Sequence, residues 1–155
     1  MEDTHLVTEV SILQVRPQGY AVGGIWLAVG DASFPDRGWS DFIVVVLRWW
    51  AAALIRVLRS NTSNTHVWVR FMDGPFAVEI STRQPGKLML RMWSGDNVGR
   101  EVAAGEADLA QFLREFVDQS RELLAECQSR EWWSPNAETL DEYLPDLDRE
   151  LSARS

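Results

Sequence analysis

Side chains that commonly do chemistry are few in this sequence, and they do not cluster. The chain has two histidines, His5 and His66, and one cysteine, Cys127. No histidine and cysteine group has the spacing of a metal site, so we expect no bound metal. Cys127 falls on the apolar face of a predicted helix, where a small core residue is expected, and a single cysteine excludes an internal disulfide.

Carboxylates gather near the C-terminus, and paired carboxylates can perform general acid–base chemistry in a pocket that shifts their pKa values. Spread along an amphipathic helix, they are typical of a solvated face. The sequence also lacks a glycine-rich phosphate loop and a nucleophile elbow. We therefore expect no catalytic residue, no cofactor and no enzymatic activity. The acidic set is Glu138, Asp141, Glu142, Asp146, Asp148 and Glu150.

Tryptophan is the unusual feature, with eight residues against two tyrosines. Alternation along the predicted strands places Trp26, Trp68 and Trp93 opposite the main apolar face of each strand. If those strands are neighbours, the three indoles share a surface with Arg70, Glu79 and Arg91. Tryptophan and arginine dominate binding hot spots. The alternatives are that the C-terminal helices cover this face or that two copies pair through it.

Five strand segments have the required alternation, namely His5–Val15, Tyr20–Val29, Thr65–Met72, Pro75–Thr82 and Lys87–Trp93, and Asn97–Ala103 is expected as a short edge strand. Asp73-Gly74 predicts a type I′ hairpin, Gln84-Pro85-Gly86 a second turn, and Pro17-Gln18-Gly19 a turn after the first strand. The Gly23-Gly24 pair predicts a bulge or a close backbone approach. These segments predict an antiparallel sheet.

A long helix is predicted over Trp39–Leu58, with Ser40 or Asp41 as its N-cap and only a thin polar stripe. Periodicity predicts a second helix from about Glu106 to Arg130, and Ser134-Pro135 opens a third, which Pro145 should kink or interrupt. The prediction is one α+β domain over residues 1–155. It has an antiparallel sheet of about five to six strands, one long central helix after the second strand, and two C-terminal helices over about 106–151.

Charge is distributed unevenly along the chain, whose formal net charge is −8. Residues 101–155 hold 14 acidic and 5 basic side chains, whereas residues 1–100 are nearly balanced. Such acidity argues against nucleic acid or an anionic membrane as ligand and would attract a basic partner. Alternatively, the negative charge serves only to keep the protein soluble. With no signal peptide and no transmembrane segment expected, a cytoplasmic location is predicted.

The chain resembles small uncharacterised bacterial proteins in a series of short motifs. In chain order these are Phe34-Pro35-Asp36, Trp39, Asp41 to Leu47, Trp49-Trp50 and Phe71 to Pro75. Those look like the immunity proteins encoded beside secreted polymorphic toxins. The resemblance covers about residues 20–95, and its motifs are structural. It implies a cytoplasmic protein that neutralises a toxin domain encoded nearby by occluding it, without turnover.

Two sets of residues are the candidate partner contacts. The first set is Trp68, Trp93, Arg70 and Arg91, and the second is the acidic helix with Glu138, Asp141, Glu142 and Asp146. A different class of function is a small-molecule-binding domain or small enzyme with a Trp-lined closed pocket between sheet and helix. That alternative requires His66, Arg70 and Glu79 to converge in the pocket. A third hypothesis is that the chain is a structural subunit of a homodimer.

Overall fold

The structure, a computed structural model, describes residues 1–15, 20–60 and 65–154. In chain order its elements are β1 (Glu2–Val15), β2 (Ala21–Val29), β3 (Ala32–Phe34), β4 (Ser40–Asp41), α1 (Ile43–Leu58), β5 (His66–Arg70), β6 (Phe76–Ser81), β7 (Lys87–Ser94), the 3-10 turn η1 (Asp96–Val98), β8 (Arg100–Asp108), α2 (Leu109–Ser129) and α3 (Pro135–Ala153). The turn expected at residues 17–19 and the polar run at 61–64 lie outside the described residues.

The strands form one mixed sheet in the order β3-β2-β1-β8-β7-β6-β5, with β4 also pairing β2. All neighbours are antiparallel except β1 and β8, which pair in parallel through Glu2↔Gly105 and Asp3↔Glu106. The α+β character is present, but the predicted antiparallel sheet of five to six strands is wrong. The sheet formed by residues 1–15, 20–60 and 65–154 has eight strands, and the long helix follows the fourth of them rather than the second.

The largest error concerns β8, expected as a short edge strand over Asn97–Ala103. It is a nine-residue strand between β7 and β1. Its sequence is rich in small residues and has little of the β-branched character that identifies strands. The small residues have a packing role, because a Cβ at Gly105 would lie 2.7 Å from the Glu2 carbonyl oxygen. Gly105 therefore permits the close approach of β1.

The start of α1 also differs from the expectation. Ser40 and Asp41 form the short strand β4 against Gly24 and Gly23, and Phe42 occupies the N-cap position without a side-chain cap. Gly23 is nevertheless a close-approach site, because a Cβ there would lie 3.3 Å from side-chain atoms of Ile43 and Leu13. The two C-terminal helices begin with side-chain caps from Asp108 and Ser134. Helix α3 continues through Pro145 without a break.

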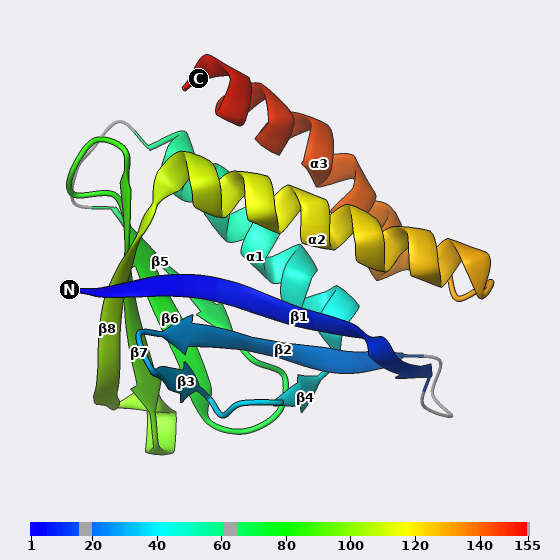
Figure 1. Cartoon of the computed structure of the whole chain (residues 1–155), viewed down its shortest axis with the longest axis horizontal. Helices are drawn as coiled ribbons and strands as arrows, with labels where there is room; N and C mark the ends of the chain where they lie inside the picture. The colour runs from blue at the N-terminus through cyan, green and yellow to red at the C-terminus, as the bar shows by residue number, and fades with distance from the viewer. Residues whose placement is uncertain (16–19, 61–64, 155) are drawn as a thin grey trace.

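The three helices gather on one side of the curled sheet (Figure 1). Helix α1 packs against β5 and β2, α3 packs on α1, and α2 contacts α3, β1 and β8. Within α1 only Arg48, Trp49, Ala52 and Arg56 are not buried, so the thin polar stripe is confirmed. Among the described residues, no helix combines the length and apolarity needed to cross a membrane.

The inner face of β5–β7 supplies much of the core, as alternation predicted. Val67 and Val69 on β5, Val78 and Ile80 on β6, and Leu88, Leu90 and Met92 on β7 are all buried in one cluster with α1. The β5–β6 loop is not the expected type I′ turn. Gly74 has φ 75°, but Asp73 does not have positive φ, and the Phe71 amide donates to the Phe76 carbonyl across a four-residue loop.

Candidate functional site

The opposite face of β5–β7, called the outer face here, carries four candidate residues: Trp68 and Arg70 on β5, and Arg91 and Trp93 on β7. The strand register aligns Trp68 with Glu79 of β6 and Glu79 with Arg91. It likewise aligns Arg70 and Trp93 with the two sides of one β6 residue, Ala77. The structure therefore brings the predicted sheet residues together on one surface.

The two indoles of the outer face are in contact. The ring centroids of Trp68 and Trp93 lie 5.6 Å apart at an interplanar angle of 51°. Ala77 between them is completely buried, whereas Trp68 is 46% exposed. Helix α1 is buried against the inner face of these strands, and α3 packs on α1 and α2 (Figure 1). The alternative that the C-terminal helices cover these indoles is therefore wrong.

Charged side chains of the outer face are largely paired with one another. The Arg91 guanidinium donates two hydrogen bonds to Glu101 of β8, at 2.9 and 2.7 Å, and lies 5.3 Å from the Trp93 ring centroid. The hydrogen bond raises the pKa of Arg91 and lowers the pKa of Glu101. Glu79 lies 3.6 Å from Arg91 and 3.2 Å from His66. This network orients Arg91 beside the indoles.

Two open hollows flank Trp68. The outer hollow, of about 400 Å3, is lined by Trp68, Arg70, Trp93, Asn97 and Val98. The edge groove, of about 220 Å3, lies between α1 and β5 and is lined by Trp49, Ala52, Ala53, Arg56, Val67 and Trp68. Trp68 therefore separates two concave surfaces and contributes to both.

Backbone strain borders the outer hollow. Asn97 and Val98 have φ of 56° and 45°, and a β-branched residue in the left-handed region is a genuine outlier. Such strain persists only where surrounding structure holds it, and it concentrates at binding and catalytic sites. The turn at η1 thus fixes one wall of the hollow at a conformational cost.

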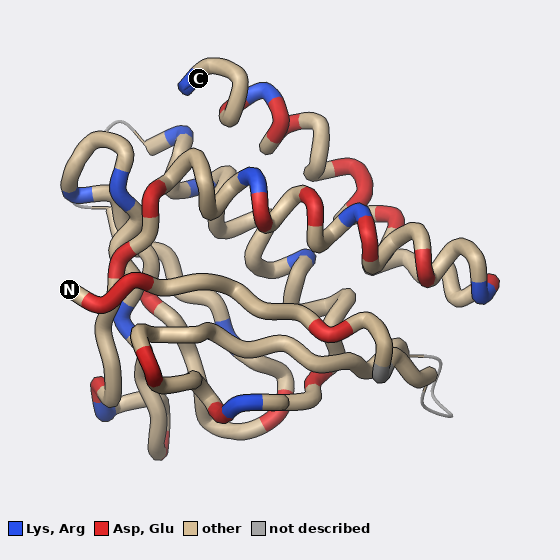
Figure 2. The backbone as a smooth tube through the Cα atoms, in the orientation of Figure 1, with Lys and Arg blue, Asp and Glu red and all other residues tan. Residues whose placement is uncertain are grey.

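The acidic candidates of α3 do not join this surface, because α3 packs on α1. Asp141 and Glu142 are exposed. Glu138 accepts a hydrogen bond from the Trp133 indole at 2.7 Å, and Asp146 lies 3.7 Å from Arg59 and also pairs with Arg149. Figure 2 shows acidic positions along α2 and α3. The two candidate sets are separate surfaces with different chemistry.

Trp26 is not part of the outer face. It lies on β2, near the far end of the sheet from β5, and is 6% exposed. The grouping of three indoles is wrong because β2 and β5 are separated by four other strands. Trp49 lies outside the thin polar stripe predicted for the long helix, yet it is only half-buried and lines the edge groove. Trp49 precedes Ala52 by three residues and Arg56 by seven, which places it on the same side of the helix as these two. That spacing could have indicated from the sequence that Trp49 is not fully buried.

The Trp-lined closed pocket between sheet and helix is not present in the described part of the chain. His66, Arg70 and Glu79 lie on the outer face, and the space between sheet and helix is filled by Trp50, Leu54 and the inner-face residues. A separate open hollow of about 330 Å3, lined mainly by apolar residues including Phe34, Phe76 and Val102, lies between β3 and β8. It contains no ionisable side chain.

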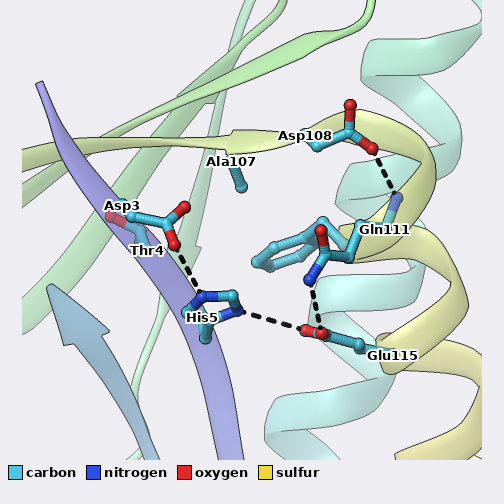
Figure 3. Close-up of a pocket in the computed structure, with 8 residues that line it drawn as sticks. Asp3, Thr4, His5, Ala107, Asp108, Gln111 and Glu115 are labelled. Atoms are coloured by element: carbon cyan, nitrogen blue, oxygen red, sulfur yellow. Dashed lines mark hydrogen bonds and ion pairs between the residues drawn. The ribbon is translucent and has the colours of Figure 1, made fainter. Parts of the chain in front are cut away.

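A histidine with two carboxylates lies between β1 and α2 (Figure 3). His5 is 2.9 Å from Asp3 and 3.4 Å from Glu115, which also accepts a hydrogen bond from Gln111. Burial lowers the pKa of His5, but the hydrogen bonds to the two carboxylates outweigh it and raise the pKa. The adjoining hollow is only about 10 Å3, which is room for about one water molecule. This group therefore connects strand to helix and has no space for a substrate.

Cys127 is buried in the core, and burial raises the pKa of its thiol. A thiol held protonated in this way is a poor nucleophile and metal ligand. No group of three or more histidine, cysteine or acidic side chains placed to hold a metal occurs in the described ranges. Comparison of the chain with protein-family models, curated proteins and solved structures finds no match.

Proposed function

We propose that this chain is a non-catalytic cytoplasmic protein that binds a protein partner through the outer face around Trp68 and Trp93. The observation that carries the proposal is the contacting indole pair, partly exposed beside Arg70 and opening onto a hollow of about 400 Å3. Interface hot spots are enriched in tryptophan and arginine set in concave, desolvated surroundings. An exposed indole held rigidly by a second one also loses little conformational entropy on binding.

In the specific form of the proposal, the chain is an immunity protein that neutralises a toxin domain encoded nearby by occluding it. The resemblance over residues 20–95 suggests this class, and the paired charges of the outer face suit protein recognition better than turnover. The acidity of residues 101–155 supports it through a long-range field that would speed the approach of a basic partner. The same field would repel nucleic acid.

The test is co-expression and co-purification with the product of the adjacent gene, followed by calorimetric titration. We expect a complex at micromolar concentration or tighter, and Trp68→Ala should weaken it about 30-fold, as the loss of about 2 kcal/mol at a hot spot implies. The matched control is the double variant D141N/E142Q on α3, which should weaken binding less than about threefold.

Absence of a complex at micromolar concentration would contradict the proposal. If the α3 variant abolishes binding while Trp68→Ala does not, the contact surface is the acidic helix instead. A concentration-dependent dimer in sedimentation that Trp68→Ala dissociates would assign the outer face to a second copy of the chain.

A further inference from the structure

Strand β5 forms one edge of the sheet. In the described residues, β5 pairs only with β6 and ends the strand order, whereas the opposite end finishes in β3, a strand of three residues. Short edge strands, prolines, bulges and charged side chains are the usual protections of an edge. Arg70 is such a charge, and it does not repel a strand of opposite charge. β5 has five residues, no proline and an unshifted register with β6 over all of them.

The orientation of the β5 backbone follows from its pairing. The Phe71 amide donates to the Phe76 carbonyl, and hydrogen-bonded pairs alternate along an antiparallel ladder. Val69↔Val78 and Val67↔Ile80 are therefore the next hydrogen-bonded pairs. The amide and carbonyl groups of the residues between them, including Trp68 and Arg70, point away from β6 toward the free edge. These are the groups that an added strand would bond.

The two hollows extend on both sides of this edge. The edge groove is bordered by Trp49 and Ala52 of α1 and by Val67 and Trp68 of β5, and the outer hollow continues past Trp68 to Trp93. The side chains of an added strand would alternate between the two faces of the sheet. One set would contact the groove beside Trp49, and the other would contact the indole pair.

The local charge indicates which strand fits. Among the residues lining the two hollows, the ionisable side chains are Arg56 and Arg70, and both are exposed. Neither has a carboxylate within ion-pair distance in the described part of the chain. On a protein of net charge −8, this edge is locally cationic. Complementarity therefore favours Asp and Glu in the incoming segment.

We propose that β5 receives an extended acidic segment of a protein partner as an additional antiparallel or parallel strand, held by main-chain hydrogen bonds and by Arg56 and Arg70. Such strand addition takes its affinity from the backbone and its specificity from alternate side chains. This inference rests on the proposed function, because it names how the same surface takes its partner and what chemistry that partner presents.

The test uses a capped synthetic peptide of about eight residues, a usual strand length. It repeats valine-glutamate-glutamate-valine, so each face of the added strand presents glutamates, one face toward Arg56 and the other toward Arg70. Amide hydrogen exchange of the protein is followed by NMR with and without this peptide. The amides of Trp68 and Arg70 should exchange freely in the protein alone and slow by about tenfold or more when the peptide is bound. The Val67 and Val69 amides, already bonded to β6, should be protected in both states.

Two controls separate backbone pairing from charge. The matched valine–lysine peptide should bind wild type at least about tenfold more weakly, and the double variant R56E/R70E should reverse that preference. Trp68→Pro removes the edge-facing amide as well as the indole, so it should bind the glutamate peptide more weakly than Trp68→Ala.

Three results would overturn the inference: no binding of the glutamate peptide at about 1 mM, binding that leaves the Trp68 and Arg70 amides unprotected, or equal binding of both peptides. Protection of the Trp68 amide in a peptide-free dimer would assign the edge to a second copy and also contradict it. If the neighbouring gene product binds but the peptide does not, only the strand-addition mode fails. If the peptide binds and no partner complex forms, only the proposed function fails.

Discussion

The inner and outer faces of β5–β7 are made from the same three strands but differ in what covers them. The inner face contacts α1, and Val78, Ile80, Leu88, Leu90 and Met92 on it are fully buried. On the outer face, within the described ranges, no helix lies over the strands. Trp68 and Trp93 lie over Ala77 there, with the Arg91 network beside them. Substitutions on the inner face should therefore change stability, and substitutions on the outer face should change binding.

The two regions also show how an acidic protein can have a locally cationic surface. Its negative charge is concentrated in the last third of the sequence, on α2 and α3, whereas Arg56 and Arg70 line the edge of the sheet. Net charge governs approach over about a Debye length, and local charge governs contact. Under the proposed function, the helical layer and the sheet edge would therefore contact different parts of one partner.

The largest effect is expected from Leu90→Ala on the inner face. Deleting a fully buried leucine side chain leaves a cavity and should lower the free energy of unfolding by about 2–5 kcal/mol. Urea denaturation measures it. Arg91→Ala, one residue along on the outer face, is the control and should cost far less, because exposed ion pairs contribute little to stability. Equal losses would contradict the distinction between the two faces.

Asp41, a buried carboxylate, offers a sharper comparison because it connects β4 to the β5–β6 loop. It accepts hydrogen bonds from the Trp39 indole at 3.1 Å and from the amides of Phe42 and Asp73 at 2.7 and 3.2 Å. In Asp41→Asn, the amide group would replace one acceptor with a donor. We expect a loss of about 1–3 kcal/mol near neutral pH by urea denaturation. The exposed Asp36→Asn should change little.

The pH dependence of the Asp41 variant has a defined sign. Burial raises the pKa of Asp41 above its ordinary value of 3.8, although its three hydrogen bonds lower it in part. The folded state then holds a proton that the unfolded state releases, so the contribution of Asp41 to stability is fully present below pH 3.8 and is lost as pH rises through the folded-state pKa. Asparagine lacks this proton, so the stability gap to wild type should narrow as pH rises through that range. A gap that widens instead would show that the pKa is not raised.

The smallest effect is expected from Trp93→Phe on the outer face. The Trp93 Nε1 atom is buried and has no hydrogen-bond acceptor in the described residues. Phenylalanine removes that unpaired donor and keeps an aromatic ring beside Trp68, so the free energy of unfolding should change by less than about 1 kcal/mol. Urea denaturation of the variant and of wild type measures this difference. A loss above about 2 kcal/mol would mean that the indole nitrogen has a partner or that the ring size is essential to the pair.

Alternation and periodicity predicted the parts of the fold whose residues carry a strong local pattern. The inner face of β5–β7, the buried stripe of α2 and the Ser134 cap of α3 are of this kind. The sequence could not show that Gly105 lets β1 lie parallel to β8, because that contact joins residues far apart in the chain. The indoles were assigned to the correct side of their strands. Whether a helix covered them, and which strands were neighbours, depended on tertiary packing.

Parallel pairing of Glu2 with Gly105 has a consequence for how the chain is made. During synthesis on a ribosome, the first strand emerges long before the partner that joins it to the meander of β5–β8. The edge of β1 that pairs with β8 therefore stays exposed until residue 105 has left the exit tunnel. Closing so large a loop is slow. Nascent chains of this protein should depend on chaperone protection until that late junction forms.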